Sequence, residues 1–223
     1  MHFAVIVFPG SNCDHDAYHV FRHILDVPVN FVWHRETDLK KYDAIIIPGG
    51  FSYGDYLRTG AIARFSPVME SVIKEANAGK PVFGICNGFQ ILIESGLLPG
   101  ALIINQDVRF LSQDVTLEVE STDSIYTCSL KKGHRLTMPI AHKQGNFIAD
   151  TDTLKILENE NRIAFRYSKD KNGNPNGSTN LIAGILNKEK NLLGMMPHPE
   201  RAVESILGSD DGINIFKSMI GMV

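Results

Sequence analysis

The residues with the clearest chemical potential lie in the pentapeptide 84–88 (GICNG), where Cys86 stands two positions from a glycine on each side. This is the G-x-S-x-G pattern of a nucleophile elbow with cysteine in place of serine. Small flanking residues are needed because the nucleophile occupies a strained turn between a buried strand and a helix. The helix N-terminus favours the thiolate, and the N–H of Asn87 points toward an oxyanion formed on a substrate. The pattern predicts a nucleophilic cysteine.

Two other thiols compete for this role. Cys13 also follows an apolar run and begins a helical segment, but it lacks the flanking glycines, and the neighbouring Asp14 opposes a thiolate. Cys128 has no comparable context and is predicted to be structural. The alternative for Cys86 is an inert, buried cysteine in a glycine-rich turn. Three widely spaced cysteines do not indicate a disulfide framework, which favours a reducing cytoplasm.

A cysteine nucleophile needs a base within hydrogen-bonding reach, and that base usually needs an orienting group. His198 has a carboxylate two residues on, Glu200, and lies between two prolines in the segment 197–200 (PHPE). Pro199 disfavours helical dihedrals at His198, so both side chains can lie on one side of an extended or turned segment. We expect Glu200 to accept from one ring nitrogen while the other faces Cys86.

His15, His19 and His23 invite a zinc reading because they recur every four residues. They drift by about 80° around a helix, and no H-E-x-x-H pattern is present. A solvated or partly packed helix face is therefore predicted, and no metal site. The chain also contains neither a G-x-G-x-x-G fingerprint nor a G-x-x-x-x-G-K-[ST] loop, so no ATP site is recognisable.

Composition excludes several classes of protein. The 223 residues are 43% hydrophobic and 21% charged, with a net charge of −3, which does not suggest the basic patch that nucleic acid requires. No apolar run approaches the ~18 residues of a membrane helix, and the N-terminal run is too short for a signal peptide.

Apolar runs of strand length alternate with amphipathic segments of helix length through the first half of the chain. Strands are predicted at residues 3–8, 29–33, 42–47 and 81–85, and helices from about residue 13, at 67–78 and at 87–95. Because the strands are apolar on both faces, the pattern indicates an α/β fold with an open, mostly parallel sheet covered by helices on both faces.

The second half has a different pattern. Residues 116–120 alternate like a half-exposed strand, and residues 162–167 and 181–186 form strand-like runs separated by a polar stretch, 168–179, which is predicted to be a mobile hairpin loop. A strand at 192–196 leads to His198, and a helix ends the chain. Antiparallel strands are therefore expected to extend the sheet, and the absence of repeats and linkers predicts one domain over 1–223.

Taken together, residues 84–90 (GICNGFQ) and 197–200 (PHPE) resemble the class I, triad-type glutamine amidotransferases. Other segments resemble more specifically the glutaminase subunits of phosphoribosylformylglycinamidine synthases: residues 8–14 (FPGSNCD), 48–58 (PGGFSYGDYLR), 175–178 (PNGS) and 194–202 (GMMPHPERA). The resemblance covers essentially the whole chain.

The resemblance implies roles for individual residues. Cys86 would be the nucleophile, His198 the general base and acid, and Glu200 its orienting partner. The backbone of Gly50 or Phe51, with the N–H of Asn87, would form the oxyanion hole. Further positions would lie along the glutamine site: Gln90, Arg109 and Phe110.

It also implies a reaction shared between chains. Glutamine would be hydrolysed here, and ammonia would pass to a large synthetase subunit that converts formylglycinamide ribonucleotide to the amidine, with a small accessory subunit in the complex. No cofactor is expected in this chain, and ATP and Mg are expected on the synthetase. Two departures from the family pattern are Thr59, in place of a small residue or cysteine, and residues 142–145 (HKQG), in place of His-Gly-Glu-Gly.

Two other functions are compatible with the residues. One is a stand-alone cysteine hydrolase of related fold, such as a γ-glutamyl hydrolase or a ThiJ/PfpI-like protein. The other is a small-molecule-binding regulatory subunit in which Cys86 is inert.

Overall fold

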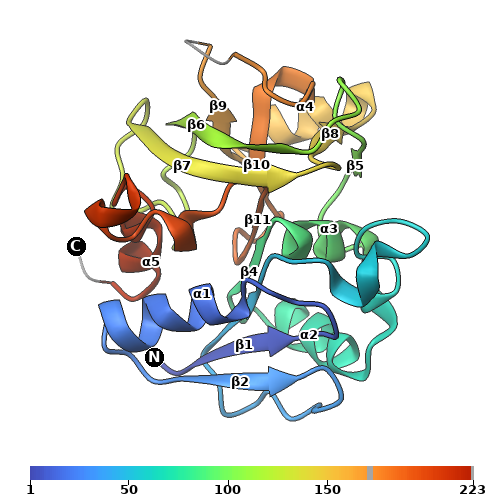
Figure 1. Cartoon of the computed structure of the whole chain (residues 1–223), viewed down its shortest axis with the longest axis vertical. Helices are drawn as coiled ribbons and strands as arrows, with labels where there is room; N and C mark the ends of the chain where they lie inside the picture. Colours follow the sequence, from blue (N-terminus) through green and yellow to red (C-terminus); the bar gives the residue numbers. More distant parts are fainter. Residues whose placement is uncertain (170–172, 222–223) are drawn as a thin grey trace.

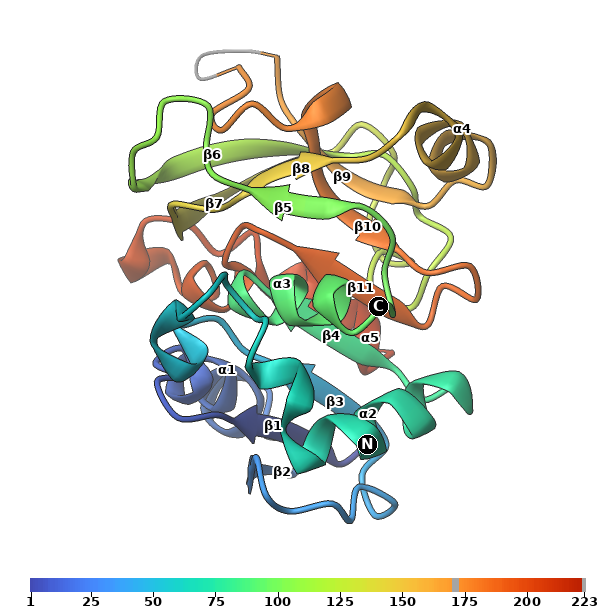
Figure 2. The same ribbon diagram turned by 90° about the vertical axis from the view of Figure 1, so that its right-hand side faces the viewer.

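The described residues, 1–169 and 173–221 of a computed structural model, form a nine-stranded sheet in the order β2-β1-β3-β4-β11-β10-β9-β6-β7 (Figures 1 and 2). The first five of these are parallel to one another: β2 (Val29–Trp33), β1 (Phe3–Val7), β3 (Ala44–Ile47), β4 (Val82–Ile85) and β11 (Leu192–Met195). All but β2 are almost wholly buried, as their continuous apolar runs predict.

Helices cover both faces of this parallel part. Figure 2 shows α2 (Pro67–Asn77) and α3 (Asn87–Glu94) on the near face, with α1 (Asp14–His19) and α5 (Ile213–Met219) behind the sheet. α1 continues as a π-helical turn, Val20–Ile24, whose Phe21 contacts both Phe3 of β1 and Phe216 of α5. The predicted α/β fold is therefore confirmed.

The C-terminal half adds the antiparallel strands that the alternating pattern predicts. They continue the sheet from β11 through β10 (Ile182–Leu186), β9 (Ile163–Tyr167), β6 (Leu111–Val119) and β7 (Arg135–His142). A separate antiparallel pair, β5 (Ala101–Ile103) and β8 (Asn146–Ile148), and the helix α4 (Thr151–Asn159) complete this half.

The sequence pattern did not predict β5, β7, β8 or α4. β7 alternates between buried and partly exposed residues, but Pro139 interrupts it, and proline argues against a strand inside a sheet. Because β7 is the last strand of the sheet, this proline is tolerated at an edge. The two three-residue strands are too short to show a period.

The polar stretch 168–179 does connect β9 to β10 as a hairpin, as predicted, but part of it is firmly packed. Asn176 and Ser178 are buried and both donate to the carbonyl of Gly145, at 2.8 and 3.2 Å. Residues 170–172 lie outside the described residues. The prediction of a mobile loop is thus wrong for Asn176 and Ser178, because their side chains are used in tertiary hydrogen bonds.

The parallel strands β1, β3, β4 and β11 end at the same edge of the sheet. The segments that follow them begin at Pro9, Pro48, Cys86 and Met196. Ligands of open α/β sheets bind outside the carboxyl ends of the strands, so the fold brings the predicted catalytic segments to one place. In the described part of the chain no helix has the length and apolarity needed to cross a membrane.

Candidate active site

Cys86 occupies a strained turn between β4 and α3. Its backbone has φ +50° and ψ −103°, outside the regions that non-glycine residues ordinarily populate. The flanking glycines explain how the turn closes, because a Cβ at Gly88 would lie 1.9 Å from the carbonyl oxygen of Ile47. A Cβ at Gly84 would lie 2.7 Å from the carbonyl oxygen of Gly88. The elbow predicted from the pentapeptide is present in the backbone, and such strain is typical of functional sites.

The contact at Gly88 gives a test of the turn. Gly88→Ala is expected to destabilise the fold by roughly 3 kcal/mol, because the Ile47 carbonyl is backbone and cannot yield without moving β3. Gly96→Ala, at the other end of α3, is the matched control. It meets no atom within 4 Å and should cost about 1 kcal/mol, from its positive φ alone. Urea unfolding measures both, and equal losses would contradict the close-packed elbow.

His198 follows β11 and is oriented by contacts at both its backbone and its ring. Its N–H donates to the carbonyl of Pro139 at 2.8 Å, and its Nδ1 lies 2.6 Å from Oε1 of Glu200. Both side chains are almost completely buried. His198 Nε2 is also buried and has no hydrogen-bond partner among the described residues. The geometry predicted for this pair is the one observed: Glu200 holds one ring nitrogen, and the other is available.

The unpartnered Nε2 of His198 belongs to a ring that lies close to Cys86. A Cβ at Gly49 would lie 2.8 Å from His198 Cε1 and 3.4 Å from Cys86 Cβ, so the absence of a side chain at Gly49 lets the two residues approach. Burial by itself lowers the pKa of His198, but Glu200 and Cys86 raise it, and the net pKa lies well above its ordinary value. The environment therefore stabilises an imidazolium ion next to a thiol.

Cys13 belongs to the same cluster, which the sequence did not predict. Its Sγ accepts from Nη2 of Arg201 at 3.1 Å, and Cys13, His198 and Glu200 each place one ligand-type atom within 4.8 Å of the others. Burial raises the pKa of Cys13, whereas the neighbouring His198 opposes the shift. Cys13 lacks the strained elbow of Cys86, while Cys128 is exposed. The cluster could hold a metal ion. The hydrogen bond between His198 and Glu200, however, is the one that a catalytic triad needs to orient its histidine.

The candidate oxyanion donors differ in their availability. The N–H of Asn87 is in the first turn of α3, where no helical carbonyl precedes it. The N–H of Phe51 donates to the carbonyl of Gly10 at 3.1 Å, so it is already engaged. Gly50 lies directly before it, with φ +137°, which only glycine adopts readily. Of the two backbone donors predicted as alternatives, Gly50 and Phe51, the geometry favours Gly50.

A cavity of about 290 Å³ opens beside Cys86. It is lined by residues from four segments of the chain, among them Gly50, Phe51, Gln90, Phe110 and Gln144. Gln90 and Phe110, two of the residues predicted along the glutamine site, therefore lie in the lining of this cavity. The side-chain amide of Gln90 is held at both ends, by Nδ2 of Asn87 at 2.9 Å and by the carbonyl of Gln144 at 2.6 Å. Arg109 does not line this cavity, and its carbonyl instead accepts from Asn105.

The two departures from the family pattern contact each other across the cavity. Thr59 Oγ1 donates to Oε1 of Gln144 at 2.6 Å, which joins the loop after β3 to the loop after β7. The second loop is braced by Asn105, which receives a hydrogen bond from Gly145 and lies 3.1 Å from Nδ1 of His142. Burial, with the nearby charge of His198, lowers the pKa of His142 to about 3, so this ring is neutral.

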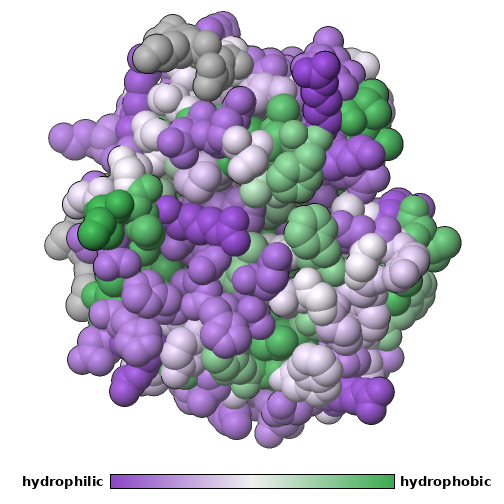
Figure 3. All heavy atoms as spheres, viewed as in Figure 1, coloured by the Kyte–Doolittle hydropathy of each residue, from purple (hydrophilic) through white to green (hydrophobic). Residues whose placement is uncertain are grey.

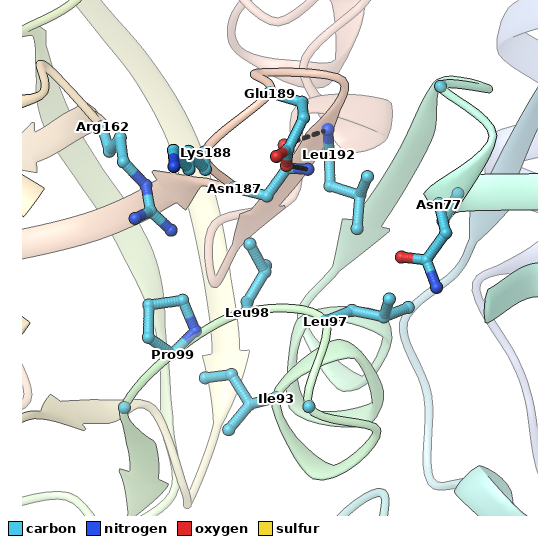
Figure 4. A pocket seen from close by; sticks show the side chains of 14 residues that line it. Asn77, Ile93, Leu97, Leu98, Pro99, Arg162, Asn187, Lys188, Glu189 and Leu192 are labelled. Atoms are coloured by element: carbon cyan, nitrogen blue, oxygen red, sulfur yellow. Dashed lines mark hydrogen bonds between the residues drawn. The ribbon is translucent and has the colours of Figure 1, made fainter.

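A larger cavity, about 690 Å³, lies at the opposite end of the strands (Figure 4). It is bounded by the ends of α2 and α3 and by the turn between β10 and β11. In Figure 4, Asn187 bonds to Glu189 and to the N–H of Leu192 across that turn. Arg162, at its edge, is committed to Glu160 and to the carbonyl of Leu186. No candidate nucleophile or base lines this cavity, so we place the active site at Cys86.

The fold and this site together define a glutamine amidotransferase. A family model described as the CobB/CobQ-like glutamine amidotransferase domain matches residues 1–213, and the chain belongs to that family.

The similar proteins are more specific. The chain is 55% identical to phosphoribosylformylglycinamidine synthase subunit PurQ of Koribacter versatilis, over 99% of this chain and 98% of the relative. It is 54% identical to the PurQ subunit of a Nostoc species, over 100% of this chain and 98% of that protein. A chain in the structure of PurLQS from Thermotoga maritima is 43% identical, with a TM-score of 0.89 over 99% of this chain and 97% of that chain. The glutaminase domain of Trypanosoma brucei CTPS, 14% identical with a TM-score of 0.63 over 100% of this chain and 95% of that chain, shares the fold.

Proposed function

We propose that this chain is the glutaminase subunit of a phosphoribosylformylglycinamidine synthase and hydrolyses glutamine with a Cys86–His198–Glu200 triad. The observation that carries the proposal is the buried His198–Glu200 pair, joined at 2.6 Å, whose free ring nitrogen lies beside a cysteine in a strained elbow. The PurQ subunits that resemble the chain over its whole length support the particular reaction.

In this mechanism the Cys86 thiolate attacks the side-chain amide carbon of glutamine. The N–H groups of Gly50 and Asn87 hold the oxyanion of the tetrahedral intermediate. His198 donates its proton to the departing ammonia, leaving a glutamyl thioester on Cys86. His198 then takes a proton from water, which hydrolyses the thioester to glutamate. Glu200 keeps the ring oriented and stabilises the imidazolium throughout.

The released ammonia must reach a second subunit before water protonates it. We assign the synthetase reaction, with its ATP and Mg, to a large partner subunit, and expect a small accessory subunit in the complex. The PurLQS structure that contains a similar chain supports this division.

Exposed apolar residues around the cavity mouth are consistent with a covering partner. Leu57 is 93% exposed and Tyr56 74%, and Phe51 and Phe110 at the mouth are also exposed. Figure 3 shows hydrophobic side chains over the segment between β3 and α2, and a second group over the segment after β11. Exposed apolar patches of this kind mark interaction sites.

We also propose that residues 1–223 form one glutaminase domain, since one continuous sheet carries every candidate catalytic residue. The free state of all three cysteines is consistent with a reducing cytoplasm.

The direct test is glutamine hydrolysis by the purified chain, alone and with its synthetase and accessory subunits, ATP, Mg and formylglycinamide ribonucleotide. We expect glutamate release to rise at least tenfold in the complex, coupled to amidine formation. Rapid hydrolysis of glutamine or γ-glutamyl peptides by the isolated chain, unaffected by the synthetase, would instead indicate a stand-alone cysteine hydrolase. Failure of a thiol-reactive glutamine analogue to label Cys86 would indicate an inert binding subunit.

A further inference from the structure

The cavity beside Cys86 contains a carboxylate oxygen that has no hydrogen-bond partner in the described chain. Asp55 lines the cavity, and its Oδ1 is fully buried without a hydrogen-bond partner. The nearest positive residue along the loop, Arg58, is already held by two hydrogen bonds of 2.6 Å to Glu94. A buried carboxylate oxygen without a partner is costly, and such an atom indicates a ligand that completes it.

The loop that carries Asp55 is strained and fixed. Tyr53, Gly54 and Asp55 all have positive φ angles, between +54° and +70°. The loop is nevertheless anchored, because the Tyr53 hydroxyl lies within hydrogen-bond distance of His34 and Ser66, and its N–H donates to the carbonyl of Pro9 at 2.6 Å. Strain maintained by surrounding contacts is typical of residues that are positioned for a ligand.

The charges that line the cavity match the head of a free amino acid. Asp55 is the unpaired negative group, and Lys143, on the facing loop, has no ion pair with a described residue. Glutamine has an α-ammonium and an α-carboxylate group, which need one partner of each sign. Burial raises the pKa of Asp55 to about 6, and a bound ammonium group would offset this cost of desolvation.

We propose that Asp55 binds the α-ammonium group of the glutamine substrate and so selects free glutamine over amides that lack this group. The proposal rests on the proposed function, since it concerns the substrate of the same site. Asp55 would be a specificity residue at the outer end of the cavity, while Cys86 acts on the side-chain amide at the inner end.

The test compares two substrates in the assembled complex: glutamine, and glutaramate, which is glutamine without its α-amino group. Asp55→Asn keeps the size of the side chain, and asparagine tolerates the positive φ of this position. We expect kcat/KM for glutamine to fall about 10- to 150-fold, chiefly through KM, because a charged hydrogen bond is lost. For glutaramate, kcat/KM should change less than about threefold, since this substrate has no ammonium group to lose.

Asp26→Asn is the matched control, because Asp26 also has a positive φ but is exposed and outside the cavity. This substitution should leave kcat/KM unchanged for both substrates. Equal losses of kcat/KM for glutamine and glutaramate in Asp55→Asn, or no loss for glutamine, would overturn the assignment of Asp55 but not the proposed function. Absence of glutamine hydrolysis by the unsubstituted complex would overturn the proposed function as well. If glutaramate turnover is too slow to measure, its inhibition constant against glutamine gives the same comparison.

Discussion

Cys86→Ala is expected to reduce glutamine-dependent amidation by the assembled complex by about 10⁴-fold or more, while amidation with free ammonia continues at its normal rate. The reason is that the sulfur forms the covalent intermediate, whereas the synthetase uses ammonia from any source. Formylglycinamidine ribonucleotide is measured with glutamine and with an ammonium salt, each at saturating ATP. The ammonia-dependent rate also shows that the variant folds and assembles.

Cys13→Ala is the matched control for Cys86→Ala. Cys13 lies in the same buried cluster as His198 and accepts a hydrogen bond from Arg201, but it is outside the strained elbow. We expect a loss of tenfold at most with glutamine. The assignment of the nucleophile would be wrong if Cys13→Ala removed glutamine-dependent activity and Cys86→Ala retained it.

His198→Ala is expected to lower glutamine-dependent kcat by about 10³- to 10⁴-fold, again with ammonia-dependent synthesis intact. Without the imidazolium, nothing stabilises the thiolate or protonates the leaving ammonia. The buried position between Pro139 and Glu200 offers no second base, since the neighbouring His142 is neutral and engaged with Asn105. Alkylation of Cys86 by iodoacetamide at neutral pH should slow in parallel.

Glu200→Gln separates orientation from charge at the same site. The amide side chain at position 200 can still accept a hydrogen bond from Nδ1 of His198. The negative charge that raises the pKa of His198 is removed, however, and burial then lowers that pKa. Since the imidazolium is the form lost as pH rises, the alkaline limb of the kcat/KM profile for glutamine should move to lower pH. An unchanged profile in Glu200→Gln, or a modest effect of His198→Ala, would contradict the triad.

The local motifs explain how much of the site could be inferred in advance. The elbow around Cys86 depends on glycines two residues away and on the strand and helix beside it, all of which are near neighbours in sequence. The pairing of His198 with Glu200 likewise depends on two residues and an intervening proline. Interactions over such short separations are encoded by spacing, so the predicted geometry was confirmed in both cases.

Other features require residues that are distant in sequence. The hydrogen bond between Thr59 and Gln144, the position of Cys13 beside Arg201 and the engagement of Phe51 with Gly10 each join separate loops. No pattern within one segment indicates such contacts. For the same reason Arg109, which was predicted along the glutamine site, lies outside the lining of the cavity.

Patterns within the sequence are sufficient to predict the α/β fold, the strained elbow at Cys86 and the local pairing of His198 with Glu200. These follow from hydrophobic period, turn chemistry and short spacings, which act along the chain. The packing of the folded chain makes β1, β3, β4 and β11 end together, which brings Cys13, Cys86 and His198 into one cluster. It also buries Oδ1 of Asp55 in the cavity without a partner. Burial and charge compensation depend on every segment packed around a group, so they are properties of the folded molecule and not of any one stretch of sequence.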